Sequence, residues 1–130
     1  MEEIEASIRH LLGELIERIP AVTGALASSA DGFLLADRVP AGDGVEVSSV
    51  AAMSAAAVGL ANSLTSLTGD APADFCHQRS VDGQVFVFRI ANIAVLTVLT
   101  DAQANPEQIR LIGTEVAKGI QRLFRSTALV

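Results

Sequence analysis

The chain has 130 residues, a net charge of −6 at pH 7 and a pI near 4.7. This length allows one domain with a buried core and is too short for two, so we expect residues 1–130 to form a single domain. The acidic balance, the lack of Trp and Tyr and the presence of only five Phe argue against a nucleic-acid-binding surface, which needs a cationic patch and stacking aromatics.

The N-terminal part predicts a helix followed by a hairpin. Apolar side chains recur at spacings of three and four over residues 2–19, as in an amphipathic helix, and Pro20 ends it. Its acidic first turn suits the helix dipole and is unlike the basic start of a secretion signal. Residues 21–28 and 33–37 are predicted strands, joined by a Ser-Ala-Asp-Gly turn at residues 29–32.

The next segment, residues 38–46, contains one proline and two glycines and is expected to be a surface loop. We take Arg38, Asp43 and Glu46 as candidate partner-binding residues of this loop. Arg38 could also act as a charge-stabilising finger in a partner's active site, although a solvated arginine is the simpler interpretation.

A charge-free stretch, residues 47–68, predicts a long helix that Ser48 or Ser49 caps and Gly69 ends. Two stripes follow helical spacing. The stripe of mainly large apolar side chains is predicted to lie on the domain's own core: Val50, Met53, Ala57, Leu60, Leu64 and Leu67. The other stripe contains nothing larger than Ser: Ala52, Ala56, Gly59, Ser63 and Ser66.

The small stripe is interpreted as a subunit interface, because small side chains let a second backbone approach closely. Half of the chain's residues are hydrophobic, a surplus that also favours oligomerisation. A membrane span is an alternative, but the Ser, Thr and Asn content of the stretch and its many alanines disfavour insertion. A helix buried wholly within a monomer is a second alternative.

The C-terminal half predicts three strands and a helix. Residues 74–81 are polar enough for an edge strand, and Asp82-Gly83 then signals a hairpin. Residues 84–91 and 93–100 are strands that are apolar on both faces, so helices must cover both faces in a three-layer α/β/α sandwich. Asn105 and Pro106 open the last helix. The predicted order is α-β-β-α-β-β-β-α.

No catalytic or cofactor-binding constellation is recognisable. Phosphate-binding glycine motifs are absent, and His10 lacks a second ligand one turn away. Cys76 and His77 are neighbours on a strand and should point to opposite faces, so they cannot readily act as nucleophile and base. The single cysteine excludes an internal disulfide and suits a reducing cytoplasm. We therefore expect a cytoplasmic protein that is not an enzyme and needs no cofactor or metal.

Residues 19–26 (Ile-Pro-Ala-Val-Thr-Gly-Ala-Leu) and 29–36 (Ser-Ala-Asp-Gly-Phe-Leu-Leu-Ala) resemble the start of the Roadblock/LC7 family. There, a helix end similar to Ile/Val-Pro-Gly-Val leads into a strand, a Ser-x-Asp-Gly turn and a second apolar strand. Ala21 stands where that signature usually has Gly, a departure that bears on the turn geometry. Through the element order and the small-residue central helix, the likeness covers nearly the whole chain and is greatest to short bacterial members encoded beside Ras-like GTPases.

The resemblance implies a profilin-like and roadblock-like fold with a five-stranded antiparallel sheet, the first and last helices on one face and the central helix on the other. It also implies a homodimer in which the central helices pack together and edge strands join the sheets through Phe75, Cys76, His77 and Gln78. Family members bind small Ras-like GTPases and regulate their nucleotide cycle or localisation, or act as dimeric adaptors. A sensory or ligand-binding module and a purely structural dimeric scaffold are the alternatives.

Overall fold

The computed structural model describes residues 2–42 and 44–128, with side chains described up to residue 126. Its elements follow the predicted order, α-β-β-α-β-β-β-α. The helices are α1 (Glu2–Arg18), α2 (Val47–Thr65) and α3 (Pro106–Ala128). The strands are β1 (Val22–Ser29), β2 (Leu34–Arg38), β3 (Phe75–Arg79), β4 (Gln84–Ile90) and β5 (Ala94–Thr100).

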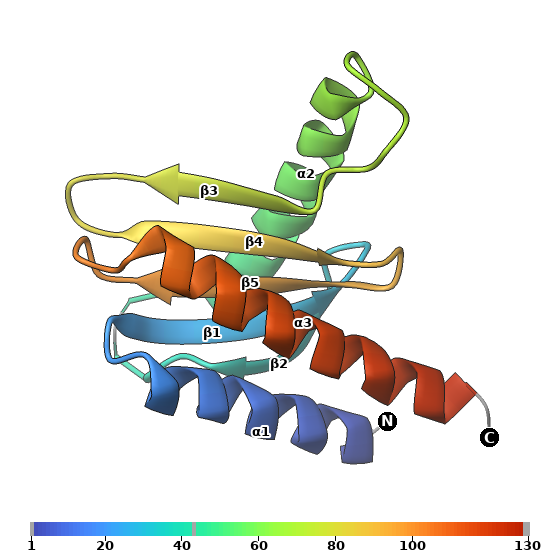
Figure 1. Cartoon of the computed structure of the whole chain (residues 1–130). Coiled ribbons are helices and arrows are strands. Elements are labelled where there is room, and N and C mark those ends of the chain that lie inside the picture. Colours follow the sequence, from blue (N-terminus) through green and yellow to red (C-terminus); the bar gives the residue numbers. More distant parts are fainter. Residues whose placement is uncertain (1, 43, 129–130) are drawn as a thin grey trace.

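The five strands form one antiparallel sheet in the order β2-β1-β5-β4-β3. Helices α1 and α3 cover one face of this sheet, and α2 crosses the other (Figure 1). The three predicted layers and the α+β fold class are thus confirmed. The last turns of α2 extend past the β3 edge of the sheet, away from the rest of the domain (Figure 1).

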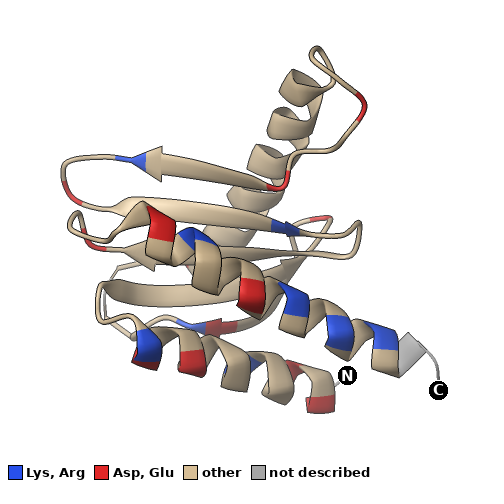
Figure 2. Cartoon of the chain, viewed as in Figure 1, with Lys and Arg blue, Asp and Glu red and all other residues tan. Residues whose placement is uncertain are grey.

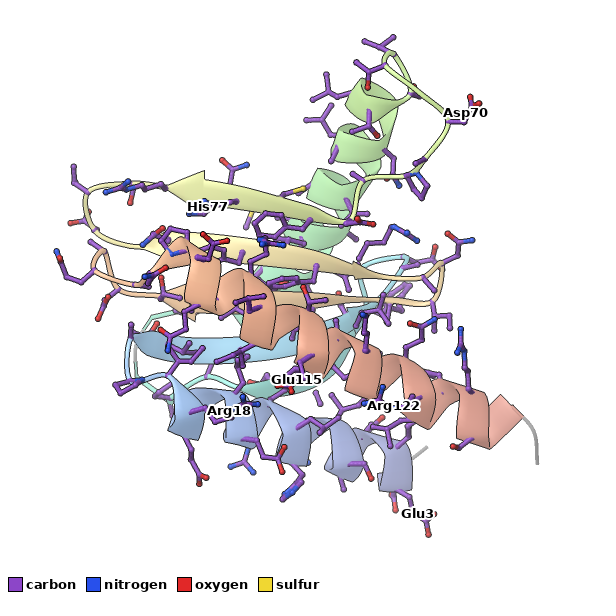
Figure 3. All side chains as sticks on the ribbon, viewed as in Figure 1. Glu3, Arg18, Asp70, His77, Glu115 and Arg122 are labelled. Carbon is purple, nitrogen blue, oxygen red and sulfur yellow. The ribbon has the colours of Figure 1, made fainter. Side chains whose placement is uncertain are left out.

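The main core lies between the sheet and the α1/α3 layer. Its largest buried side chains come from all of these elements: Ile8, Leu12 and Leu15 of α1, Ile109 and Ile120 of α3, and Phe86, Phe88 and Leu96 of the sheet. Gly113 lets α3 lie directly on the sheet, because a Cβ at this position would be 2.3 Å from Cζ of Phe88. Arg18 and Glu115 form an ion pair that links α1 to α3 (Figure 3).

The layer between α2 and the sheet is much thinner. Ala51 and Ser54 are the buried residues of α2, and Ser54 Oγ accepts a 2.7 Å hydrogen bond from Thr97 Oγ1 of β5. The turn after β1 also approaches the helix closely, since a Cβ on Gly32 would lie 3.1 Å from Cα of Ala52. Gly32 has a φ of +93°, so both its conformation and its surroundings favour glycine.

The prediction that the large stripe of α2 lies on the domain's own core is wrong. Its large members remain exposed by 59–81%: Met53, Leu60, Leu64 and Leu67. The reason is the close approach of helix and sheet, which leaves room for Ala51 and Ser54 but not for Leu or Met. Val50 and Ala57, the other two members of that stripe, are half-buried at its margin. The small stripe and the large side chains therefore face away from the sheet.

The ends of α2 also differ from those predicted. Neither Ser48 nor Ser49 is the N-cap; instead, Glu46 holds an extended backbone and its carboxylate accepts from the Ser48 backbone N–H at 3.2 Å. The helix ends at Thr65, with Ser66 as C-cap, rather than running to Gly69. At α3 the predicted cap is confirmed, since Asn105 Oδ1 accepts from the backbone N–H of Glu107 at 2.9 Å.

Candidate functional site

The most unusual surface of the domain is the outward face of α2, which we define as two adjacent rows of residues. The small row is Ala52, Ala56, Gly59, Ser63 and Ser66, all exposed. The large row is Met53, Leu60, Leu64 and Leu67, also exposed. At 100° per residue the two rows lie side by side, and no charged residue interrupts them (Figure 2).

Local contacts leave the small row smooth. The hydroxyls of Ser63 and Ser66 donate to carbonyl oxygens of their own helix, at 3.1 and 2.7 Å, so they need no outside partner. A Cβ on Gly59 would meet no atom within 4 Å. Packing within the chain therefore does not explain this glycine, which costs a helix about 1 kcal/mol relative to Ala.

Strand β3 provides a second incomplete surface next to α2. Among the described strands, only β4 pairs with it. In an antiparallel pair, every second residue of a strand exchanges backbone hydrogen bonds with the neighbouring strand. The Asp74 carbonyl accepts such a bond from the Arg89 backbone N–H at 2.9 Å, so the residues that bond to β4 are Asp74 and every second residue after it. The backbone groups directed away from β4 therefore belong to Phe75, His77 and Arg79.

Cys76 and His77 lie on opposite faces of β3, as predicted. The Sγ of Cys76 is 3.8 Å from the Ala57 carbonyl oxygen of α2, whereas the His77 ring stacks on Phe86 on the α1/α3 side, with ring centroids 4.2 Å apart. Desolvation by burial raises the pKa of the Cys76 thiol. The thiol therefore stays protonated near neutral pH and lacks the activation of a nucleophilic cysteine.

His77 has a structural role that the sequence did not reveal. The Gln84 side-chain amide donates from Nε2 to the carbonyls of Ala104 (2.9 Å) and Ala102 (3.4 Å). Its Oε1 is then the atom that faces His77, and His77 Nε2 donates to it at 2.7 Å. This chain of bonds ties β3 to β4 and to the segment before α3.

The predicted partner-binding loop is only partly available to a partner. Arg38 is the last residue of β2, and its Nε donates to the Arg9 carbonyl of α1 at 3.1 Å. Glu46 caps α2, and Asp43 lies outside the described residues. Arg38 is thus held against α1 rather than extended as a finger, and a partner-binding role for these three residues stays a prediction.

Other site types are poorly represented in the parts of the chain that the structure describes. There, no three His, Cys, Asp or Glu side chains lie close enough together to hold a metal ion. By length and composition, α2 is the one described helix that could cross a membrane. It is instead the central helix of the domain, laid against the sheet through Ala51 and Ser54.

Comparison with protein-family models matches residues 9–100, more than two thirds of the chain, to the Roadblock/LC7 domain. The chain belongs to the Roadblock/LC7 family. Domains of this family are generally non-catalytic and regulatory. A comparison with curated proteins finds no match.

Solved structures show how widely this Roadblock/LC7 fold is shared. Myxococcus xanthus MglB superposes with a TM-score of 0.83 at 16% identity, covering 94% of this chain and 90% of that one. A Roadblock/LC7 domain from Streptomyces avermitilis gives 0.81 at 19% identity, covering 90% and 97%. Acanthamoeba castellanii profilin IB gives 0.58 at 16% identity, covering 82% and 89%. The profilin-like and roadblock-like fold is therefore confirmed.

Proposed function

We propose that this Roadblock/LC7 domain is a non-catalytic homodimer that binds a small Ras-like GTPase and regulates its nucleotide cycle or localisation. The observation that supports this most directly is the outward face of α2, an uncharged helical surface with large apolar side chains exposed. Monomeric proteins rarely expose contiguous apolar surface of this kind, which usually marks a protein–protein contact.

Pairing of two α2 helices would suit both rows of the outward face. A two-fold interface uses the same patch on each subunit, so the patch must be complementary to itself. Leu60 and Leu64 of one copy form a ridge, and Ala56, Gly59 and Ser63 of the other form a groove that can receive it. This proposal keeps the predicted interface residues Ala52, Ala56, Gly59, Ser63 and Ser66 and adds the large row.

The free edge of β3 would extend the same interface. The backbone groups that point away from β4 belong to His77 and to the residues two positions before and after it, Phe75 and Arg79. A two-fold axis through His77 pairs Phe75 of one copy with Arg79 of the other and satisfies all three residues. Cys76 and Gln78 would then lie opposite each other, so all four predicted β3 residues take part.

The proposed GTPase partner rests on membership in the family, whose members bind small Ras-like GTPases. It is consistent with the protonated Cys76 and the structural role of His77, which leave no nucleophile and base on β3. The rim beside the joined helices, including the exposed Leu67 at the far end of α2, is the proposed contact surface. A cytoplasmic location follows from this partner and remains part of the proposal.

Two measurements test the proposal in sequence. Sedimentation equilibrium of the purified chain should give twice the monomer mass at micromolar concentration, and Gly59→Leu should lower that mass without loss of helical circular dichroism, because Gly59 has open space around it. The dimer is then mixed with a Ras-like GTPase from the same organism, loaded with GDP or a GTP analogue. A monomeric native chain refutes the dimer, and no complex with either form and no change in GTP turnover refutes the GTPase function.

A further inference from the structure

A cleft of about 630 Å³ lies on the sheet face opposite α2. One wall is α3, and the other is formed by the start of β3, the end of β4 and the turn between β4 and β5. Phe75 and Phe88 line it, with their ring centroids 5.4 Å apart, and provide an apolar floor. The cleft is separate from the outward face of α2 and shares only Phe75 with the proposed dimer contact.

Positive charge dominates the lining of this cleft. Its charged residues are three cations, Arg89, Arg110 and Lys118, and one acid, Asp74. Arg110 and Lys118 lie two turns apart on the same side of α3, and Arg110 also forms an ion pair at 3.2 Å with the exposed Glu107 one turn earlier. On a chain of net charge −6, this local excess of cations is an exception, and α3 carries most of it (Figure 2).

The cations of the cleft are only partly used inside the chain. Arg89 donates from Nε to the Ala73 carbonyl and from a terminal nitrogen to the Ala91 carbonyl, at 2.9 and 2.7 Å, which fixes its guanidinium at the cleft. Its other terminal nitrogen is 3.8 Å from the exposed carboxylate of Asp74, a distant contact. The Lys118 ammonium has no ion pair or hydrogen bond with any residue that the structure describes.

We propose that this cleft is a docking site for an acidic peptide segment of another protein, one that carries an apolar side chain between its acidic residues. The cations supply charge complementarity to the carboxylates, and the floor of Phe75 and Phe88 receives the apolar side chain. A planar anionic membrane could reach the exposed Lys118 but not the recessed floor. The large row of α2, which could insert into lipid, faces the opposite side of the sheet.

The test uses the full chain and a fluorescein-labelled peptide, Glu-Glu-Asp-Leu-Glu-Asp-Glu, in an anisotropy titration at about 0.1 M salt, where the Debye length is about 10 Å. Lys118→Glu should weaken binding about tenfold or more, because it replaces a charge-assisted contact with repulsion. Arg122→Glu is the matched control. It makes the same charge change one turn further along α3, where Arg122 lines a different groove against α1 (Figure 3). That variant should lose markedly less affinity than Lys118→Glu, because its new carboxylate lies outside the lining of the cleft, although only one turn separates it from Lys118.

Several outcomes would overturn the proposal. The first is that the wild-type chain does not bind the peptide. The second is that Lys118→Glu and Arg122→Glu lose the same affinity for it. The third is that a peptide with Gln and Asn in place of Glu and Asp binds as tightly as the acidic one. Lys118-dependent binding to phosphatidylserine vesicles without peptide binding would assign the surface to a membrane instead. Replacing the peptide's Leu with Ser should lower the affinity, and an unchanged affinity would overturn the role given to the floor of Phe75 and Phe88. Circular dichroism and sedimentation of each variant show whether it is folded and what its mass is, so a failed dimer proposal is distinguished from a failed cleft.

Discussion

The replacement Leu60→Ser tests whether the outward face of α2 is covered by a second copy. Leu60 is 65% exposed in the single chain. Fully burying a Leu side chain is worth about 1.5–3 kcal/mol, so covering the exposed part contributes about 1–2 kcal/mol per subunit. A two-fold interface contains the residue twice, which makes the expected loss about 2–4 kcal/mol of dimerisation free energy. The dimer dissociation constant should therefore rise by about 30-fold to 1000-fold.

Leu111→Ser is the matched control for this measurement. Leu111 is 61% exposed, nearly as much as Leu60, but it belongs to α3 on the other side of the sheet. Sedimentation equilibrium over a range of concentrations should show a large shift for Leu60→Ser and none for Leu111→Ser. Equal dissociation constants for the two variants, or a dimer unaffected by either, would refute the reasoning that α2 forms the contact.

Three further predictions concern stability, measured as urea unfolding at one protein concentration because a dimer's stability depends on concentration. Ser54→Ala should lower the free energy of unfolding by about 1–3 kcal/mol, because it leaves the Thr97 hydroxyl unsatisfied. Adding Thr97→Val should recover part of this loss, whereas strictly additive losses of the two replacements would argue against the hydrogen bond. Gly113→Ala should cost about 1–3 kcal/mol, since its Cβ would overlap the Phe88 ring, and an unchanged midpoint would contradict that contact. Ala91→Gly should stabilise by about 0.5–1 kcal/mol by relieving a φ of +48°, whereas a loss of stability would show that the turn favours alanine.

The element order was predictable because each element has a strong local signal. The predicted hairpin turn at residues 29–32 ends on Gly32, which has a positive φ, and Asn105 caps α3 as predicted. The doubly apolar strands over residues 84–91 and 93–100 indicated helices on both faces, and the structure covers both. Each of these signals involves residues close together in the sequence, so it can be recognised without knowing the tertiary contacts.

The orientation of α2 was not predictable in this way. Helical periodicity identifies stripes but not which stripe faces the sheet, and choosing the larger side chains assumes a wide gap between the layers. The sheet instead offers the hydroxyl of Thr97 on this side and keeps the large rings of Phe86 and Phe88 for the other. Thr97 in the middle of an apolar strand was the available signal, because a buried hydroxyl needs a polar partner such as Ser54.

The sequence identified most of the residues of the candidate site but not how they are arranged. The small row of α2 and the edge strand β3 were both identified, yet the large row was assigned to the core and the cap role of Glu46 was missed. The cationic cleft had no sequence signal at all. Arg89 and Lys118 are nearly 30 positions apart, and only the packing of α3 on β4 brings them to one opening.

The two sides of the sheet therefore differ in how much apolar surface they bury within the chain. The α1/α3 side buries Phe86, Phe88 and the aliphatic side chains of two helices, and it can supply most of the hydrophobic stabilisation of a single chain. On the α2 side the helix itself buries only Ala51 and Ser54, against Leu26, Val87 and Val95 of the sheet, so α2 contributes less to that stability than its composition suggests. The exposed leucines of α2 are the side chains that the proposed association would cover, so pairing of two α2 helices would account for this sequence better than folding of the single chain does.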